Sequence, residues 1–579
     1  MPNKLFDSLN PLFEQAKKDK KLLFLRWSAP WSLACKKWND TLNATEEWQA
    51  LKDELVCLDW NRDWSPELDQ GIQAFVQDRA GMAGWPLNLF LDPETRTVVF
   101  ASPSMATEDF LKILRQLIVA WKVDPTQLRQ QALKEAQEFS QKDPMKFFEQ
   151  NFSEAKDELL DKKVLFRYLT PLEQSIDLTT GFVGKGSSFL FPDLYRSLMA
   201  FDDLSRFGEM ALLQLAKSPQ YDVVGGGFFR SLEWNFEAAK QAPQGSFDSK
   251  WVRSRSTEKL LVENCEMLSL YTEAFKKTEN PFYSQVAHEI IELIMEDFRM
   301  PGTTLSLASA VTAPEDFYEV TGKDLLEAVL PKDRQAAQLF FGLNEGRTLP
   351  YLSTDLPILS EYLGEEQVDL RLNLLGAKRA LKEHRVKNNG AHLKLCPPTR
   401  ISELSALRSL AQASFSFDTP RLTSLCEALV EKYASEYSSE TWSLREKSAM
   451  LRGYTSMARL YSAQRDGDRA KAMFVEAEKL ILELKDPLFL EARYESGFLG
   501  TRVDLCDHTG SSGFASLMNG ILDFNALQKL GLRGEYDLPV DISAPLSWSL
   551  AYVRTMGVYS ASIYGVAMRY LRDHKEAQA

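Results

Sequence analysis

Long apolar stretches are missing from this chain of 579 residues. The first apolar run, Leu22–Leu25, is too short for the core of a signal peptide. No later run approaches the ~20 consecutive apolar residues that a membrane-spanning helix needs. The sequence therefore predicts a cytoplasmic protein that has no membrane partner.

Positive charge is also in deficit. The chain has 68 Lys and Arg residues against 81 Asp and Glu residues, which gives a formal net charge of -13. No tract rich in Lys or Arg offsets this balance locally, and such a surface repels the phosphate backbone of nucleic acids. We therefore exclude nucleic acid as a partner.

Paired cysteines and metal-binding spacings are absent too. None of the six cysteines forms a CxxC pair, and the five histidines lack the spacing of a zinc site. Gly225-Gly226-Gly227 lacks the Lys-Ser/Thr that follows a phosphate-binding loop, so we interpret it as a tight turn. The sequence predicts neither a metal ion nor a cofactor.

The first 125 residues alternate between segments typical of strands and of helices. The turn Asp92-Pro93-Glu94 joins the last two strands as a hairpin. The order is strand, helix, strand, helix, strand, strand, helix, which is the order of the thioredoxin fold. We predict strands at 22–27, 55–60, 87–91 and 97–100, and helices at 34–52, 67–78 and 107–121.

Helical periodicity takes over in residues 126–579. Apolar residues three or four positions apart predict helices over 258–275, 404–411 and 422–429. Residues 450–463 and 469–484 form a further pair, joined by a short loop. Successive helical hairpins over ~450 residues indicate either a solenoid or a closed (α/α) toroid. Periodicity alone leaves these two architectures open.

Four segments carry a resemblance to a known family. Gly81–Leu91 (GMAGWPLNLFL) and Tyr221–Arg230 (YDVVGGGFFR) are similar to its GGWPL-x-VFL and YDQVGGGFHR motifs. Glu258–Asn264 (EKLLVEN) and Asp507–Gly513 (DHTGSSG) are similar to its EKMLYDN and DGAxPSG motifs. The chain thus resembles the spermatogenesis-associated protein 20 family. The resemblance implies a thioredoxin-like domain, residues 1–125, followed by a six-hairpin (α/α) toroid of the glycosidase type, residues 126–579.

The chain departs from this family at the positions that carry chemistry. The redox motif CHWC of the family corresponds here to Cys35–Trp38 (CKKW), so a tryptophan replaces the second cysteine. Phe229 and Ser256 stand at the two motif positions where the family has histidine. We interpret the chain as a diverged member whose redox motif has been dismantled.

Cys35 has the helix N-terminal position that redox chemistry requires, but it lacks the second cysteine. A helix N-terminus favours the thiolate, and Lys36 and Lys37 would favour it further. Disulfide exchange also needs a second thiol to resolve the mixed disulfide, and Trp38 cannot supply it. Two interpretations stay open: a relic redox position without activity, and a single reactive thiol.

The resemblance also suggests a binding surface on the thioredoxin-like domain. Pro86 matches the cis-proline that faces the active-site loop in this fold, where a neighbouring backbone can pair with an extended peptide. A plain proline at the start of a strand is the alternative. We take Trp38, Trp85 and Pro86 as candidate binding residues for a peptide or protein partner.

The toroid implies a central funnel lined by carboxylates. By their motif positions, Asp222, Glu258, Asp507 and His508 are candidate catalytic residues, and Gly226 is a candidate binding residue at the mouth of the funnel. Glycoside hydrolysis would need two carboxyl groups, and epimerisation would need an acid and a base. Helix capping alone also explains Glu258. A sugar-like small molecule is the ligand that such a funnel suggests.

These observations favour a non-redox binding or scaffold protein that has a ligand funnel in its toroid. Dithiol activity is excluded by the missing second cysteine, and the sequence gives no positive sign of an enzyme. The alternatives are a carbohydrate-active hydrolase or epimerase in the toroid, and a single-thiol redox protein that acts through Cys35.

Overall fold

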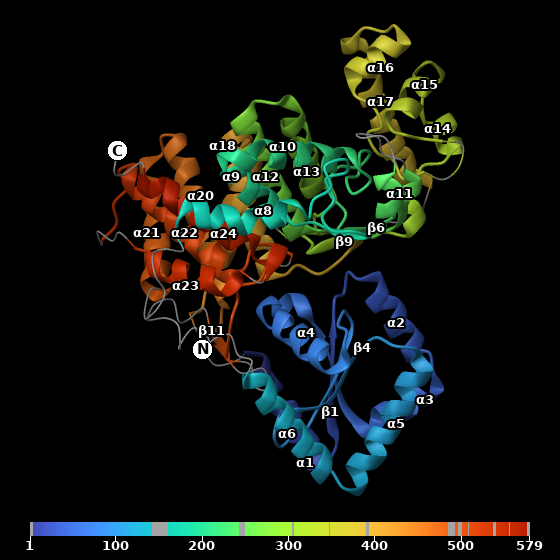
Figure 1. Ribbon diagram of the computed structural model, residues 1–579, viewed down its shortest axis with the longest axis vertical. Coiled ribbons are helices and arrows are strands. Elements are labelled where there is room, and N and C mark those ends of the chain that lie inside the picture. Colours follow the sequence, from blue (N-terminus) through green and yellow to red (C-terminus); the bar gives the residue numbers. More distant parts are fainter. Residues whose placement is uncertain are drawn as a thin grey trace.

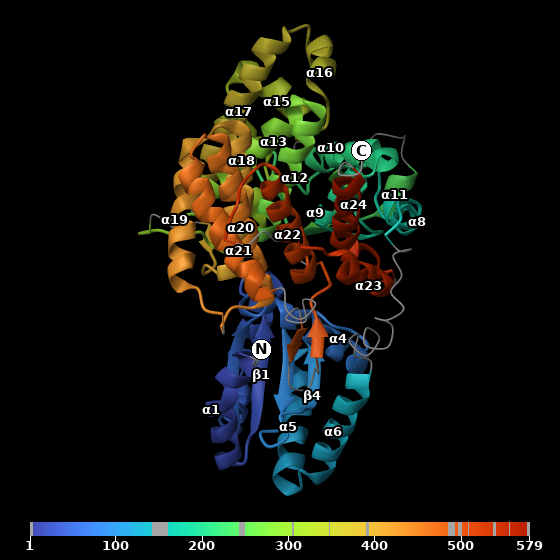
Figure 2. The ribbon, with the colours of Figure 1, turned by 90° about the vertical axis from the view of Figure 1, so that its left-hand side faces the viewer.

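The structure is a computed structural model of the chain. It describes residues 4–575 except 142–159, 242–248, 304–305, 345, 347, 389–392, 440, 485–492, 496–500, 508, 536–539 and 555. A smaller domain with a central sheet and a larger helical domain lie end to end, as Figures 1 and 2 show.

The smaller domain is built on a four-stranded sheet. Its strands are β1 (Leu22–Ser28), β2 (Leu55–Asn61), β3 (Leu87–Leu91) and β4 (Val98–Pro103). They lie in the order β2-β1-β3-β4, with β1 parallel to β2 and antiparallel to β3. Every residue of β3 is buried, and four of its five residues are apolar, as in a strand that is covered on both faces. The predicted thioredoxin-like order is confirmed.

Helices cover both faces of this sheet. They are α1 (Lys4–Asp19), α2 (Leu33–Asn43), α3 (Glu46–Leu51), α4 (Pro66–Ala80), α5 (Thr107–Val123) and α6 (Thr126–Gln141). The helix predicted at 34–52 is two helices, because Thr45 leaves the helical conformation and caps α3 through the backbone N–H of Trp48. The amphipathic α1 was not predicted.

The helix α6 belongs to the smaller domain by its packing. Phe139 stacks edge-on against Phe75 of α4, with ring centroids 5.1 Å apart. Arg129 pairs with the buried Asp92 at 2.7 Å, next to β4. The boundary predicted after residue 125 therefore falls before a helix that packs on the thioredoxin-like sheet.

The larger domain is a closed ring of alternating outer and inner helices. The outer helices are α8 (Lys162–Glu173), α10 (Asp202–Lys217), α13 (Pro281–Glu296), α19 (Pro420–Glu436), α21 (Gly467–Leu484) and α23 (Ser543–Val553). The inner helices are α9 (Pro192–Ala200), α12 (Leu261–Thr278), α18 (Arg400–Phe417), α20 (Leu444–Ala463), α22 (Gly513–Lys529) and α24 (Ala561–Lys575). Each inner helix contacts the next, and α24 packs against α9. This closure identifies an (α/α)6 toroid and excludes a solenoid.

A lobe of four further helices is inserted between α13 and α18. It contains α14 (Gly322–Ala328), α15 (Arg334–Phe340), α16 (Leu356–Leu363) and α17 (Gln367–Asn388), and it stands at the far end from the thioredoxin-like domain in Figures 1 and 2. Short strands that the helical periodicity did not predict join the toroid helices. They are β5 (Ser187–Phe189), β6 (Ser231–Trp234), β7 (Val252–Arg255), β8 (Lys259–Leu260), β9 (Ala310–Thr312), β10 (Lys394–Leu395), β11 (Arg493–Glu495) and β12 (Thr501–Val503).

Candidate functional site

The end of α2 that carries Cys35 is covered by the toroid. The cysteine is 2% exposed, and its backbone N–H donates to the hydroxyl of Ser32, which caps the helix. Its thiol lies in an apolar cluster to which both domains contribute. The cluster contains Ala29, Trp31 and Cys35 from the smaller domain, and Leu260, Ala310 and Cys396 from the toroid. Burial raises the pKa of Cys35 above its ordinary value, so the thiolate is disfavoured.

Glu258 of the toroid lies at the same helix end. Its Oε1 accepts a hydrogen bond from the backbone N–H of Leu33, the first residue of α2, at 3.0 Å. The first N–H groups of a helix have no partner inside the helix and face its positive dipole end. Glu258 therefore caps a helix, as one interpretation of the sequence proposed, but the helix belongs to the other domain.

An arginine of the toroid packs against two tryptophans of the thioredoxin-like domain. The guanidinium of Arg230 lies 4.6 Å from the ring centre of Trp31 and 5.3 Å from that of Trp85. Its Nη1 donates to Glu263 of α12 at 3.0 Å. The indole N–H of Trp31 donates to Asp63 at 2.8 Å. Cation–π contacts of this kind strengthen when they are desolvated, so they hold the two domains together.

The tryptophan at the second-cysteine position fills the core of its own domain. Trp38 packs edge-on against Phe110, with ring centroids 5.2 Å apart, and its indole N–H donates to the carbonyl of Met105. The Trp85–Pro86 peptide bond is cis, as the sequence predicted. Trp85 faces the toroid arginine described above, whereas Trp38 belongs to a core cluster of its own domain. The binding roles of these residues stay predictions.

No disulfide is present among the described residues, where all six cysteines are free thiols. Cys57 on β2 is exposed as a residue, but partial desolvation of its sulfur, together with the charge of Asp59, raises the pKa of the thiol to about 11. It is not part of the cluster that surrounds Cys35. The cysteine that shares this cluster is Cys396, from the loop after β10.

A cavity lies where the funnel of the toroid meets the thioredoxin-like domain. The first turns of α12, α18, α20 and α22 supply most of its wall. Trp31, Arg62, Asp63 and Pro66 close it from the smaller domain. The cavity leaves about 60 Å³ of free volume, which is room for several water-sized groups. It is therefore a site that neither domain forms alone.

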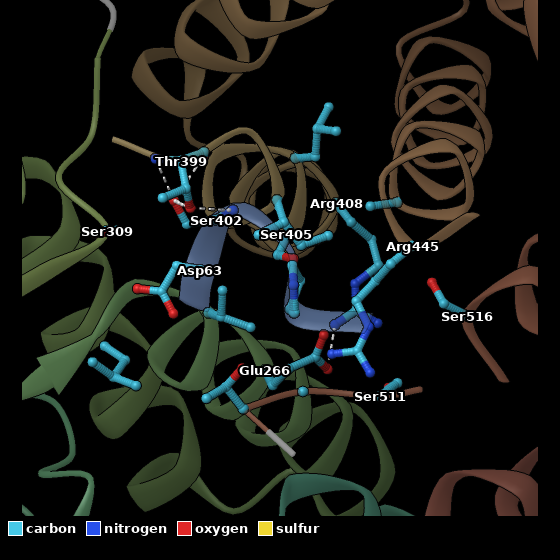
Figure 3. Close-up of a pocket in the computed structure, with 18 of the residues that line it drawn as sticks. Asp63, Glu266, Ser309, Thr399, Ser402, Ser405, Arg408, Arg445, Ser511 and Ser516 are labelled. Atoms are coloured by element: carbon cyan, nitrogen blue, oxygen red, sulfur yellow. Dashed lines mark hydrogen bonds and ion pairs between the residues drawn. The ribbon is translucent and has the colours of Figure 1, made fainter. Parts of the chain in front are cut away.

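Charged and hydroxyl side chains line this cavity. Arg408 of α18 pairs with Glu266 of α12 at 2.6 Å, and Figure 3 shows the two side chains pointing toward each other. Burial opposes ionisation of Glu266, but Arg408 and Arg196 lower its pKa to about 2. Burial also raises the pKa of Asp63, and the charge of Arg62 opposes this. The cavity carboxylates are thus held by arginines.

Two predicted residues lie in a separate buried cluster. The carboxylate of Asp222 pairs with Lys259 and with Arg385 of α17, both at 2.9 Å. Although burial opposes it, these cations hold the pKa of Asp222 well below its usual range. Gly226 has φ +81°, and a Cβ there would meet the carbonyl oxygen of Glu289 at 2.7 Å. Both residues shape the turn that the sequence predicted, and neither lines the cavity.

Asp507 is held by hydrogen bonds within the toroid. Its carboxylate accepts hydrogen bonds from the backbone N–H groups of Ser512 (3.0 Å) and Ser562 (2.7 Å). Burial and the neighbouring charge of Asp193 raise the pKa of Asp507 well above its ordinary value. His508 lies outside the described residues. Of the predicted catalytic residues that the structure describes, Asp222, Glu258 and Asp507 do not line the cavity.

The cavity residues themselves were not predicted. Arg408 and Arg452 lie in two different helices that each carry other charged residues, and the periodicity gives no sign that these two side chains share a wall. Among the described residues, no group of His, Cys, Asp and Glu side chains could hold a metal ion. No helix within the described ranges is long and apolar enough to cross a membrane.

These features define the class of this protein: a thioredoxin-like domain docked on the funnel of an (α/α)6 toroid. Residues 7–140 match a family model, Thioredox_DsbH, described as a protein of unknown function, DUF255. This range includes α6.

Curated relatives match over about half of the chain. Spermatogenesis-associated protein 20 of Mus musculus is 22% identical over 298 residues, which are 49% of this chain and 35% of the relative. The Homo sapiens protein of the same name is 24% identical over 323 residues, which are 52% of this chain and 38% of the relative. The match thus spans little more than a third of the relatives' length. Over this range the chain is similar to spermatogenesis-associated protein 20.

Two solved structures are similar to the chain. Cellobiose 2-epimerase from Spirochaeta thermophila DSM 6192 is 15% identical, with 66% of this chain and 98% of that chain covered and a TM-score of 0.25. An alpha-amylase from Clostridium perfringens is 10% identical, with 64% and 97% covered and a TM-score of 0.23.

Proposed function

We propose that this protein binds a ligand between its two domains and has no thiol redox activity. The observation that carries this proposal is the position of Cys35. The thiol is buried against the toroid, its helix end is capped by Glu258, and Trp38 stands where a resolving cysteine would be. Disulfide exchange needs an accessible thiolate and a second sulfur. In this arrangement the thiol is covered, and the second cysteine of the CxxC motif is missing.

In this proposal the toroid of the same chain covers the surface of the thioredoxin-like domain around Cys35. Trp31, Cys35 and Trp85 form the face that would meet a peptide, and toroid side chains lie against them. The face therefore serves to close the funnel of the same chain. Ligand exchange would require the two domains to separate, which couples binding to domain opening.

A binding role fits the cavity better than hydrolysis does. A glycoside hydrolase needs one protonated and one ionised carboxyl group flanking the bond. Glu266 is paired with Arg408 and Arg196, and Asp63 accepts from Trp31 and pairs with Arg62. Both carboxylates are occupied by partners in the protein. Because both carboxylates already bind protein partners, we favour binding over the hydrolase and epimerase alternatives at this cavity.

The test is a reduction assay with insulin as the disulfide substrate and dithiothreitol as the reductant. The wild-type protein and the Cys35→Ser variant are expected to give the same rate as the reductant alone, while a thioredoxin gives turnover. Turnover that depends on Cys35 would reject the proposal. The single-thiol alternative is tested by the pH dependence of Cys35 alkylation, which is expected to rise only above the ordinary thiol pKa of ~8.5.

A further inference from the structure

One arginine in the wall of the interdomain cavity has no partner. Arg452, in the third turn of α20, is 9% exposed and lines the cavity. Its Nε is buried without a hydrogen-bond acceptor, and no described residue forms an ion pair with its guanidinium. Burial and the nearby positive charge of Arg408 lower its pKa to about 10, although the negative charges of Glu266 and Asp523 oppose this. A buried charge in this state is costly unless something neutralises it.

The other arginines of the cavity are already neutralised. Arg445 forms two hydrogen bonds of 2.7 Å with Asp504. Arg408 pairs with Glu266, and Arg62 pairs with Asp69 at 3.2 Å. The positive charge of Arg452 is therefore in excess within this wall.

Helix ends and hydroxyl groups favour an anion at the same place. Because the first two turns of four inner helices face the cavity, the positive ends of their dipoles converge there. The hydroxyls of Ser405 and Ser516 line the cavity, and no described residue accepts or donates a hydrogen bond at either of them. Figure 3 shows Ser405 next to Arg408, and Ser516 on a different helix on the side of Arg445.

We infer that the interdomain cavity is a binding site for a small oxyanion, a phosphate or carboxylate group, with Arg452 as its main ligand and Ser405 and Ser516 as further hydrogen-bonding groups. This inference rests on the proposed binding function and assigns the ligand a charge. The thioredoxin-like domain, through Trp31 and Pro66, closes the site over the bound group.

The experiment measures binding of inorganic phosphate to the full chain by isothermal titration calorimetry, with chloride at equal ionic strength as the reference. The wild-type protein is expected to bind phosphate. Arg452→Met is expected to bind it about ten- to a hundredfold more weakly, because a charge-assisted hydrogen bond is lost. Arg421→Met, which removes the same charge from the exposed face of α19, is expected to bind like the wild type.

Thermal unfolding separates this role from a structural one. Without phosphate, Arg452→Met is expected to melt at the same temperature as the wild type or higher, since the variant no longer buries an unpaired charge. With phosphate, only the wild type and Arg421→Met are expected to gain stability. Equal phosphate affinity in wild type and Arg452→Met, or no binding to the wild type, would overturn the inference. Turnover in the reduction assay would instead reject the binding function, so the two failures are distinct.

Discussion

The carboxyl group of Glu67 makes the closed arrangement of the two domains sensitive to pH. Glu67 lies in the first turn of α4, and its Oε2 is buried without a hydrogen-bond partner. Burial, followed by the negative charges of Glu446 and Asp504 across the interface, raises its pKa to about 8, although its own backbone and Arg445 oppose this. A glutamate in an unfolded chain titrates near 4.5.

The sign and size of the effect follow from these two values. Between pH 4.5 and 8 the folded protein holds a proton on Glu67 that the unfolded chain has released. Stability therefore falls as pH rises through this window and is constant above it. At pH 7 the interval from 4.5 is 2.5 pH units, and at ~1.36 kcal/mol per unit the loss is up to about 3 kcal/mol. Glu67→Gln keeps the shape of the side chain and removes this loss.

Urea unfolding followed by tryptophan fluorescence from pH 4.5 to 8.5 measures the prediction. The free energy of unfolding of Glu67→Gln is expected to match the wild type near pH 4.5 and to exceed it increasingly toward pH 8. Glu431→Gln, on the exposed face of α19, is the matched control and should follow the wild type at every pH. A difference between Glu67→Gln and wild type that stays constant across this window would refute the reasoning.

Three further variants probe the interface and the turns. Glu258→Ala leaves the first N–H of α2 without its charged acceptor, so alkylation of Cys35 by N-ethylmaleimide, followed by peptide mass spectrometry, is expected to become about tenfold faster or more; an unchanged rate would contradict this role. Trp38→Cys recreates the CxxC pattern but is expected to stay inactive in insulin reduction and to lose about 3 kcal/mol or more of stability, because a buried indole is removed while Cys35 stays covered. Gly227→Ala, at φ +77° and with its new Cβ against the side chain of Leu293, is expected to lower the free energy of unfolding by more than ~1 kcal/mol in the same urea assay; a neutral effect would show that the turn can relax.

Much of the thioredoxin-like fold could be predicted because its strands are short apolar runs that turns separate. The helices α1 and α6 were missed because their amphipathic patterns gain meaning only from the sheet that they cover. The helical character of the toroid followed from periodicity, but its closure depends on contacts between α24 and α9, at opposite ends of the domain. Local patterns carry no information on such contacts.

The candidate site could be predicted only in part from the sequence. Cys35 was placed correctly at a helix N-terminus, yet the acceptor at that helix end is 225 residues away. The cavity wall comes from four inner helices and from the other domain, so no single segment shows its charge. In the sequence, Arg452 resembles a charged residue on the exposed face of a helix. Only the packing of the helices in the closed ring shows that its side chain is buried.

The motifs that carry the family resemblance hold parts of the structure together. Within the toroid, Lys259 of the EKLLVEN segment binds Asp222 of the YDVVGGGFFR segment at 2.9 Å. Between the domains, Arg230, the last residue of YDVVGGGFFR, packs on Trp31. Glu258, the first residue of EKLLVEN, caps α2. A helix end that already has a carboxylate acceptor gives no stabilisation to a thiolate. The docked toroid therefore disfavours redox chemistry at Cys35 independently of the missing second sulfur, which is why restoring that sulfur is not expected to restore activity.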